Sequence, residues 1–131
     1  MQDSIFTKII KGEIPCHKIY EDVKTLAFLD IHPIQPGHIL VIPKKQIEFV
    51  WDLDDADYQA VMSNAKRVAI RLREVFPDKP FVAVHVEGLD VPHAHVKVFP
   101  FSNDEEFRFK PDPAAEPDHG QLASIAQKLA F

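Results

Sequence analysis

The sequence predicts an α+β fold, in which a five-stranded antiparallel sheet carries one long helix across it and a short helix at each end. Five short runs have the composition or the alternation of β-strands, at residues 18–20, 25–31, 39–42, 81–86 and 93–98. Between the third and fourth runs, apolar residues recur at a spacing of three and four from Tyr58 to Phe76, which is typical of an amphipathic helix. We expect one domain over residues 1–131, because this length is enough to bury a core.

The overall charge and the cysteine content narrow the possible partners. The formal net charge is −5, which argues against a broad basic surface and therefore against a nucleic-acid polymer as partner. A small anionic ligand held by a few local groups fits this composition better. Cys16 is the single cysteine, and no apolar run is long enough to cross a bilayer. We therefore expect a cytoplasmic protein that does not associate with membranes.

The N-terminal third contains a short helix and a hairpin. Ser4 is suited to cap a helix that Gly12 and Pro15 bring to an end. The two runs that follow are joined by residues 21–24, whose turn-like composition predicts a hairpin. Asp30 comes near the end of the second run, and from composition alone it is best explained as a turn-forming residue.

A rigid loop then leads into an interior strand. Pro33, Pro36 and Gly37 restrict the backbone before His38, and the apolar run 39–42 follows at once. His38 is therefore held at the entrance of a strand. A lone histidine in such a place is more often structural than catalytic, unless other residues indicate a site.

The second half begins with the long helix, for which Asp54 is a reasonable N-cap and beyond which Pro77 lies. The turn 87–90 is short, so the two strands that it joins should be antiparallel neighbours. Residues 102–131 form an acidic, proline-rich tail that we expect to be irregular on the surface until a short helix over 121–129.

The motif with the clearest chemistry is the alternating stretch from Val91 to Pro100. Strand geometry places His93, His95 and Lys97 on one face of the strand. Each is about 6.6 Å from the next residue on that face, so two of them could contact one phosphate. Three interpretations remain open: an exposed polar face, a metal site, and a phosphate-handling site in which a neutral imidazole attacks phosphorus. Metal binding is the weakest, because structural zinc sites use four ligands, commonly cysteines.

Four segments in order resemble the histidine triad (HIT) family, in particular its nucleotide-binding branch. They are residues 4–15, 26–33, 36–44 and 93–97. The resemblance implies that His95, at the middle motif position, is a nucleophile that forms a nucleotidyl-histidine intermediate. It also implies that His93 and His38 orient and polarise the site, and that Asp30 holds the ribose hydroxyls. The base pocket that it implies is formed by five apolar residues, Phe6, Ile9, Phe28, Leu29 and Ile31.

The chain also departs from the family pattern. Lys97 replaces the third histidine, and it can place a cation against a phosphate or leaving-group oxygen. Zinc-binding relatives carry a Cys-x-x-Cys pair and a further histidine where this chain has Ser4, Thr7 and Gln46, so we expect neither a metal nor another cofactor. Asp90 replaces a polar phosphate contact, and it is tolerable there only if it faces Lys97 or points away.

The function that the resemblance implies is a nucleotide-binding hydrolase. It would act on purine nucleoside phosphoramidates or dinucleoside-polyphosphate-type substrates at the α-phosphorus, and would pair as a homodimer through the long helix and a sheet edge. Two alternatives remain within the family: a nucleotidyltransferase, and a nucleotide-binding module with little catalysis because of Lys97. A metal-binding protein and a scaffolding protein are the alternatives outside it.

Overall fold

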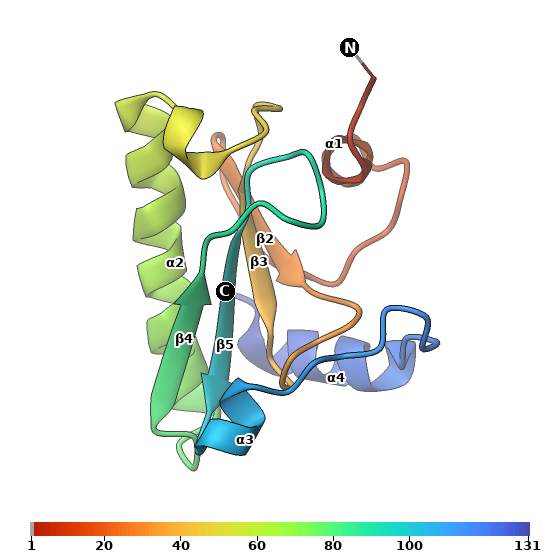
Figure 1. Cartoon of the computed structure of the whole chain (residues 1–131), viewed down its shortest axis with the longest axis vertical. Helices are drawn as coiled ribbons and strands as arrows, with labels where there is room; N and C mark the ends of the chain where they lie inside the picture. The colour runs from red at the N-terminus through yellow and green to blue at the C-terminus, as the bar shows by residue number, and fades with distance from the viewer. Residues whose placement is uncertain (1) are drawn as a thin grey trace.

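The computed structural model describes residues 2–131 and confirms the α+β class (Figure 1). Within these residues, five strands form one antiparallel sheet in the order β1-β2-β3-β5-β4. The strands are β1 (Lys18–Glu21), β2 (Thr25–Leu29), β3 (Ile39–Pro43), β4 (Phe81–His85) and β5 (Val96–Phe101). In the same part of the chain, no helix is long and apolar enough to cross a membrane.

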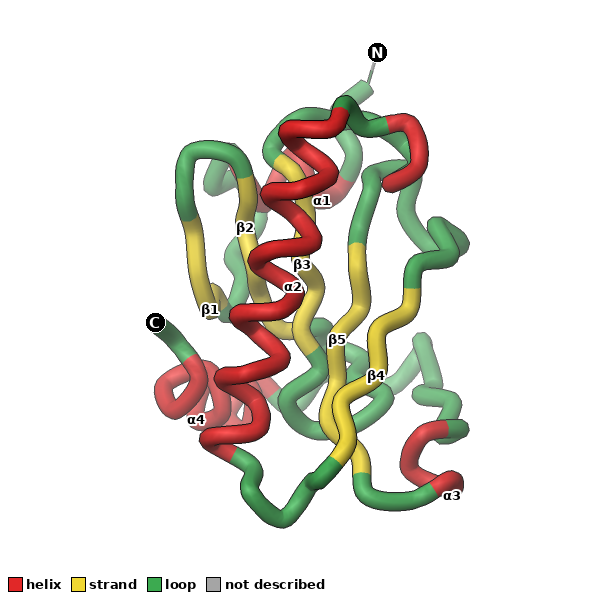
Figure 2. Tube along the Cα trace, turned by 90° about the vertical axis from the view of Figure 1, so that its left-hand side faces the viewer, coloured by secondary structure: helices red, strands yellow, loops and turns green. Residues whose placement is uncertain are grey.

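One face of the sheet is covered by the long helix α2 (Asp55–Val75), which follows the short 3-10 helix η1 (Val50–Asp52) (Figure 2). As expected, the Asp54 carboxylate caps α2 by accepting a hydrogen bond from the backbone N–H of Asp57. The predicted periodicity is realised in a buried stripe on α2, formed by Val61, Ala65, Val68 and Leu72. This stripe packs on alternate strand residues and forms the larger core of the protein.

The opposite face carries the short helix α1 (Ile5–Ile10), capped by Ser4 as predicted. A second and smaller core lies between α1 and the sheet, and its buried members are Phe6, Leu26, Phe28, Leu40 and Ile42. Because successive strand residues point to opposite faces, the neighbouring residues of β2 and β3 belong to the α2 core instead. The sheet therefore separates a face that the long helix α2 covers from one that the short helix α1 covers only in part.

The tail is more ordered than the sequence predicted. A short helix, α3 (Asp104–Phe107), interrupts the segment expected to be irregular, and α4 (His119–Leu129) begins two residues before the predicted helix. The Asn103 side chain caps α3, and the ring of Phe107 lies 5.1 Å from that of Phe101 between centroids. Local capping and aromatic packing on the sheet thus order this part of the tail.

The strand predicted to carry both motif histidines begins later than expected. β5 starts at Val96, which pairs with Val41 in the last register position of the β3–β5 ladder. Before it, the backbone N–H of Ala94 donates to the carbonyl of Ile47, 2.7 Å away, in place of a ladder partner. His93 therefore lies in a bend and His95 in an irregular segment bound to the Ile47 loop, and only Lys97 is a strand residue of the motif.

Candidate active site

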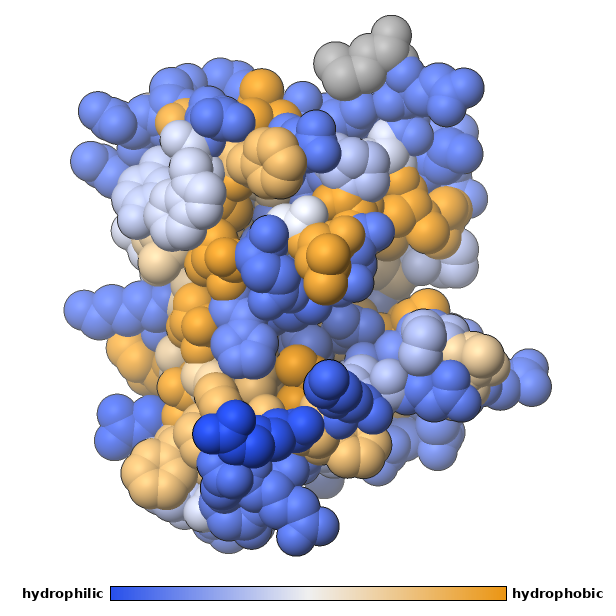
Figure 3. Space-filling view, in the orientation of Figure 1, coloured by the Kyte–Doolittle hydropathy of each residue, from blue (hydrophilic) through white to orange (hydrophobic). Residues whose placement is uncertain are grey.

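A cavity of about 620 Å³ opens on the face of the sheet that α1 covers only in part. Its walls come from α1, from β2 and β3, from the segment before β5, and from the C-terminal tail. Figure 3 shows hydrophobic side chains gathered on this face between α1 and the tail. The size is suitable for a ligand as large as a nucleotide.

All six residues that the sequence analysis assigned to nucleotide binding line this cavity. They are Phe6, Ile9, Phe28, Leu29, Asp30 and Ile31. The rings of Phe6 and Phe28 meet edge to face, with centroids 5.5 Å apart, and this contact holds the apolar part of the wall in a fixed shape. A rigid apolar wall of this kind is suited to a flat, uncharged group such as a nucleobase.

Asp30 lies directly after β2, where the chain turns toward the Pro33 loop. One carboxylate oxygen, Oδ1, accepts a hydrogen bond from the backbone N–H of His32 at 2.8 Å. Burial raises the pKa of Asp30, although the His32 N–H and the charge of Lys97 act in the opposite direction. Its Oδ2 lies 3.7 Å from His38 Nε2, beyond hydrogen-bond distance, and so remains available to a ligand.

His38 is buried, with 2% of its surface exposed, and its tautomer follows from its contacts. Nδ1 accepts a hydrogen bond from the backbone N–H of Ile34 at 3.0 Å, so the proton of the neutral ring is on Nε2. Burial lowers the pKa of His38 to about 3, with a smaller contribution from the charge of Lys97. Within the described chain, this Nε2–H has no acceptor, which is costly unless a ligand oxygen supplies one.

His95 lines the cavity with the opposite ring nitrogen free. Its Nδ1 donates to the backbone carbonyl of His93, 2.8 Å away, so Nε2 carries the lone pair. The ring stands edge to face against Phe6, with centroids 5.4 Å apart, which restricts its rotation. An imidazole held in this way presents an unprotonated nitrogen to the cavity, as a nucleophile requires.

His93 does not line the cavity, which corrects the expectation that it faces the site together with His95. Its Nε2 donates to the carbonyl of Pro43 at 2.8 Å, and its Nδ1 therefore accepts from the hydroxyl of Ser4 at 2.8 Å. Burial lowers its pKa, while the Pro43 carbonyl acts in the opposite direction. Because the segment begins before the strand, its direction is set by these contacts and not by the pleat of the sheet.

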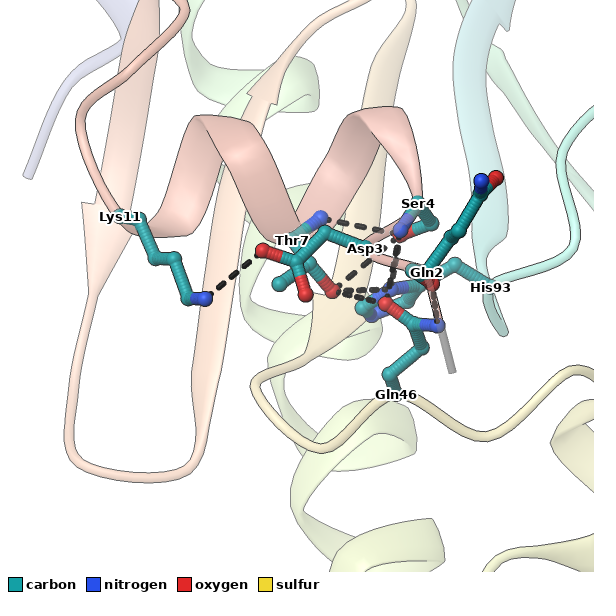
Figure 4. A network of polar contacts seen from close by, with 7 residues as sticks. All are labelled: Gln2, Asp3, Ser4, Thr7, Lys11, Gln46 and His93. Carbon is teal, nitrogen blue, oxygen red and sulfur yellow. Dashed lines mark hydrogen bonds and ion pairs between the residues drawn. The ribbon is translucent and has the colours of Figure 1, made fainter.

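Ser4, Thr7 and Gln46 surround His93 in one polar network (Figure 4). Gln46 Oε1 accepts from the backbone N–H of Ser4 at 2.8 Å and from the hydroxyl of Thr7 at 2.6 Å. Gln46 Nε2 in turn donates to the carbonyl of Gln2 at 2.8 Å. Every strong donor in the network thus has an acceptor, and the network joins α1 to the segment that carries His95.

The same network answers whether these positions could hold zinc. Two hydroxyls and an amide are neutral ligands, whereas zinc sites use thiolates, imidazoles and carboxylates. Over residues 2–131, no group of three or more His, Cys, Asp and Glu side chains is arranged to hold a metal ion. The residues present do not fit a zinc site, and hydrogen bonds connect the elements there.

Lys97 reaches the cavity from β5 and is bound by two carboxylates. Its Nζ lies 2.8 Å from Asp90 Oδ2 and also pairs with Glu87 Oε1. Burial lowers the pKa of Lys97, but the two carboxylates outweigh this effect and the net shift is upward. Of the two orientations considered for Asp90, the structure has the one that faces Lys97, and this contact lowers the pKa of Asp90.

Several lining residues had no signal in the sequence. The tail contributes Lys110, Pro111 and Pro113, which lie more than 70 residues from His38 in the chain yet share its cavity. Two hydrogen bonds hold this tail against the loop after β2, from Gln35 Nε2 to the carbonyl of Glu106 and between His32 Nε2 and the carbonyl of Ala115. Proline-rich composition predicted only an irregular segment and could not reveal its position.

The structure defines the class: an α+β protein with two neighbouring histidines beside an apolar cavity. Comparison with known proteins identifies the family. The HIT domain family model matches residues 11–104. A HIT-like protein of Borreliella burgdorferi is 36% identical over 117 residues, which cover 84% of each chain. The chain therefore belongs to the HIT domain family.

Relatives with a named activity and with solved structures agree with this assignment. The adenosine 5'-monophosphoramidase of Schizosaccharomyces pombe is 36% identical over 104 residues, covering 77% of this chain and 76% of that protein. The crystal structure of a Hit-like protein from Bartonella henselae has a TM-score of 0.81 and 30% identity, and covers 97% of this chain and 93% of its own. A zinc-bound histidine triad protein of Mycobacterium smegmatis is similar at a TM-score of 0.63 and 27% identity, covering 95% of this chain and 94% of its own.

Proposed function

We propose that this protein is a nucleotide hydrolase that uses His95 as a covalent nucleophile. Its substrates would be purine nucleoside phosphoramidates or dinucleoside-polyphosphate-type compounds, cleaved at the α-phosphorus. The observation that carries the proposal is the hydrogen bond from His95 Nδ1 to the carbonyl of His93, because it leaves the Nε2 lone pair free at the cavity. The 36% identity to a monophosphoramidase supports the same class of substrate.

The other cavity residues would bind and orient the substrate. The Phe6 and Phe28 wall would hold the base, and the free oxygen of Asp30 would accept hydrogen bonds from the ribose hydroxyls. The Nε2–H of His38 would donate to a phosphate oxygen, which would satisfy its buried proton. Lys97 would supply an ammonium charge beside the reacting phosphate.

The reaction would proceed in two displacements. In the first, His95 Nε2 forms a bond to phosphorus, the bond from phosphorus to the leaving nitrogen or oxygen breaks, and the leaving atom keeps the electron pair; a leaving nitrogen also takes a proton from solvent. In the second, water attacks phosphorus, the P–Nε2 bond breaks, and the proton lost by water returns to solvent. The products are a nucleoside monophosphate and the leaving group, with His95 restored.

A fluorogenic adenosine phosphoramidate provides the test. We expect His95→Ala to lose turnover, whereas His119→Ala, which removes a histidine on the outer surface of α4, should keep the wild-type rate. Equal rates for wild type and His95→Ala would contradict the covalent mechanism. Denatured samples quenched during turnover should contain a nucleotidylated His95 peptide by mass spectrometry.

The same proteins and substrate distinguish hydrolysis from two related functions. A nucleotidyltransferase would pass the nucleotidyl group to an acceptor other than water, so added acceptor would give a new product at the expense of the monophosphate. A nucleotide-binding module with little catalysis would show a higher melting temperature with AMP but no turnover. Lys97→His, which restores the third histidine, should then increase the rate.

We also propose that the chain forms a homodimer through α2 and the β4 edge, in the cytoplasm. β4 is an edge strand, and exposed apolar side chains lie on it and on α2, namely Ile70, Phe81 and Val84. Light scattering should give twice the mass of the chain, and Ile70→Glu with Val84→Glu should give the monomer. A monomeric wild type at micromolar concentration would contradict this proposal.

A further inference from the structure

A row of paired residues crosses the cavity face of the sheet from an apolar end to a charged end. Phe28 on β2 is opposite Leu40 on β3, Leu40 is opposite Lys97 on β5, and Lys97 is opposite His85 on β4. Adjacent strands are about 4.8 Å apart, so Phe28 and Lys97 are separated by about 10 Å along this row. In the substrate orientation proposed above, a nucleoside held at the apolar end would direct the groups beyond its phosphorus toward Lys97.

The charged end of the row carries more negative than positive charge. One ammonium, that of Lys97, is bound by the carboxylates of Glu87 and Asp90. The Lys97 side chain is only 13% exposed, whereas those of Glu87 and Asp90 are 39% and 60% exposed, so solvent screens the outer side of these ion pairs. On the same side, the ring of His85 lies 4.0 Å from Glu87 and packs edge to face against Phe99.

The geometry points to Glu87 and Asp90 as residues that determine which leaving groups this protein accepts. They select neutral or cationic leaving groups, such as amines, over anionic ones such as a nucleoside diphosphate. The inference rests on the proposed function of the cavity. Because two carboxylates already occupy the ammonium of Lys97, an anionic leaving group meets net negative charge, whereas an amine does not.

The cavity also contains a second lysine. Lys110 lines the cavity from the tail, which is held against the loop after β2 by the Gln35 and His32 contacts. Three residues before Lys110, the ring of Phe107 packs edge to face against His85, so the tail spans the cavity from the β4 side to the loop after β2. The Glu87 and Asp90 carboxylates are bound to Lys97, and the selection therefore depends on the β5 end of the row.

The test compares two substrates that share adenosine and the α-phosphorus. Adenosine tryptamine phosphoramidate releases an amine, and diadenosine triphosphate releases ADP. For the double variant Glu87→Gln with Asp90→Asn, we expect the ratio of kcat/KM values to move toward diadenosine triphosphate by about tenfold or more. Asp90→Asn alone keeps the Glu87–Lys97 pair and should give a smaller shift in the same direction.

The matched control is Asp52→Asn with Glu74→Gln, which makes the same change in net charge at two exposed positions on or beside α2. Its substrate ratio should equal that of wild type. If the Glu87 and Asp90 double variant changes both substrates by one common factor, or if the control moves the ratio equally, the selection is wrong. Circular dichroism with thermal melting would confirm that the variants are folded.

A binding measurement separates this inference from the proposed mechanism. Calorimetry with AMP and ADP should show that the double variant gains more affinity for ADP than for AMP, on the order of tenfold. A protein without His95-dependent turnover would contradict the covalent mechanism and leave this affinity ratio intact. An unchanged ADP-to-AMP ratio would instead contradict the role of Glu87 and Asp90.

Discussion

His93 and His95 are two residues apart, and both are buried, yet their surroundings differ in kind. Both ring nitrogens of His93 are hydrogen-bonded, to Pro43 and Ser4. His95 is bonded only through Nδ1 within the described chain, and its other nitrogen faces the cavity. The His93 ring, with both nitrogens hydrogen-bonded, connects structural elements. The His95 ring keeps one nitrogen available for a reaction.

The same contrast extends to the residues around each histidine. The network of Ser4, Thr7 and Gln46 pairs its donors with acceptors. Among residues 2–131, the cavity instead contains the buried Nε2–H of His38, which has no acceptor, beside the partly exposed Oδ2 of Asp30. A buried polar group that stays unpaired lowers stability, so the Nε2–H of His38 indicates a place that a ligand completes.

The largest expected effect is the loss of activity in His95→Ala. His95→Ala should reduce kcat/KM for an adenosine phosphoramidate by at least about a thousandfold, because no other ring nitrogen occupies its place. Its free energy of unfolding, measured by urea titration, should change far less. If His95→Ala lowered the free energy of unfolding as much as His93→Ala does, the distinction between a reactive His95 and a structural His93 would be wrong.

The second effect is on stability and concerns His93. His93→Ala leaves the Ser4 hydroxyl and the Pro43 carbonyl without partners and creates a buried void, so unfolding should become easier by about 2–4 kcal/mol. Urea titration at neutral pH measures this loss, and His119→Ala supplies the surface control. Wild-type stability in His93→Ala would show that the network is dispensable.

A third prediction concerns pH and the buried imidazole of His38. Its folded pKa, about 3, is below the unfolded value of about 6.5, so the unfolded chain binds more protons between these values. The stability that His38 contributes is therefore complete above pH 6.5 and is lost as the pH falls, by about 2 kcal/mol between pH 7 and pH 5.

His38→Asn is the variant for this measurement, because an amide oxygen can still accept from the Ile34 N–H. Urea titrations at pH 7, 6 and 5 should show a steeper loss of stability for wild type than for His38→Asn. Any contribution from His93, whose pKa is also lowered, is common to both proteins. Parallel pH profiles would mean that His38 is not held neutral by burial.

The smallest effect is expected from Ser4→Ala. This change removes one cap of α1 and one donor to His93, and should cost about 1–2 kcal/mol in the free energy of unfolding. Activity should stay within about threefold of wild type, because the His93 carbonyl that orients His95 is on the backbone. A large loss of activity in a folded Ser4→Ala protein would extend the active site to α1's N-terminus.

Much of the fold was accessible from local patterns. The caps at Ser4 and Asp54 and the stripe on α2 depend on near neighbours in the chain, and the structure confirms them. The late start of β5 depends on a distant partner, because Ala94 is hydrogen-bonded to Ile47. The short helix α3 was missed although its cap, Asn103, and its aromatic partner, Phe101, are both close in the chain. The first error therefore comes from a long-range contact, and the second from a local signal within a proline-rich segment.

The sequence by itself determined the class of fold, the HIT resemblance and many of the residues that line the cavity, but it wrongly included His93 and gave no signal for Lys110, Pro111 and Pro113. Tertiary structure alone decided which ring nitrogen each histidine leaves free, that His93 turns to Ser4, and that Lys97 is shared by Glu87 and Asp90. The physical reason is that periodicity records which face of an element is buried, whereas a tautomer or an ion pair depends on atoms that only folding brings within about 3 Å.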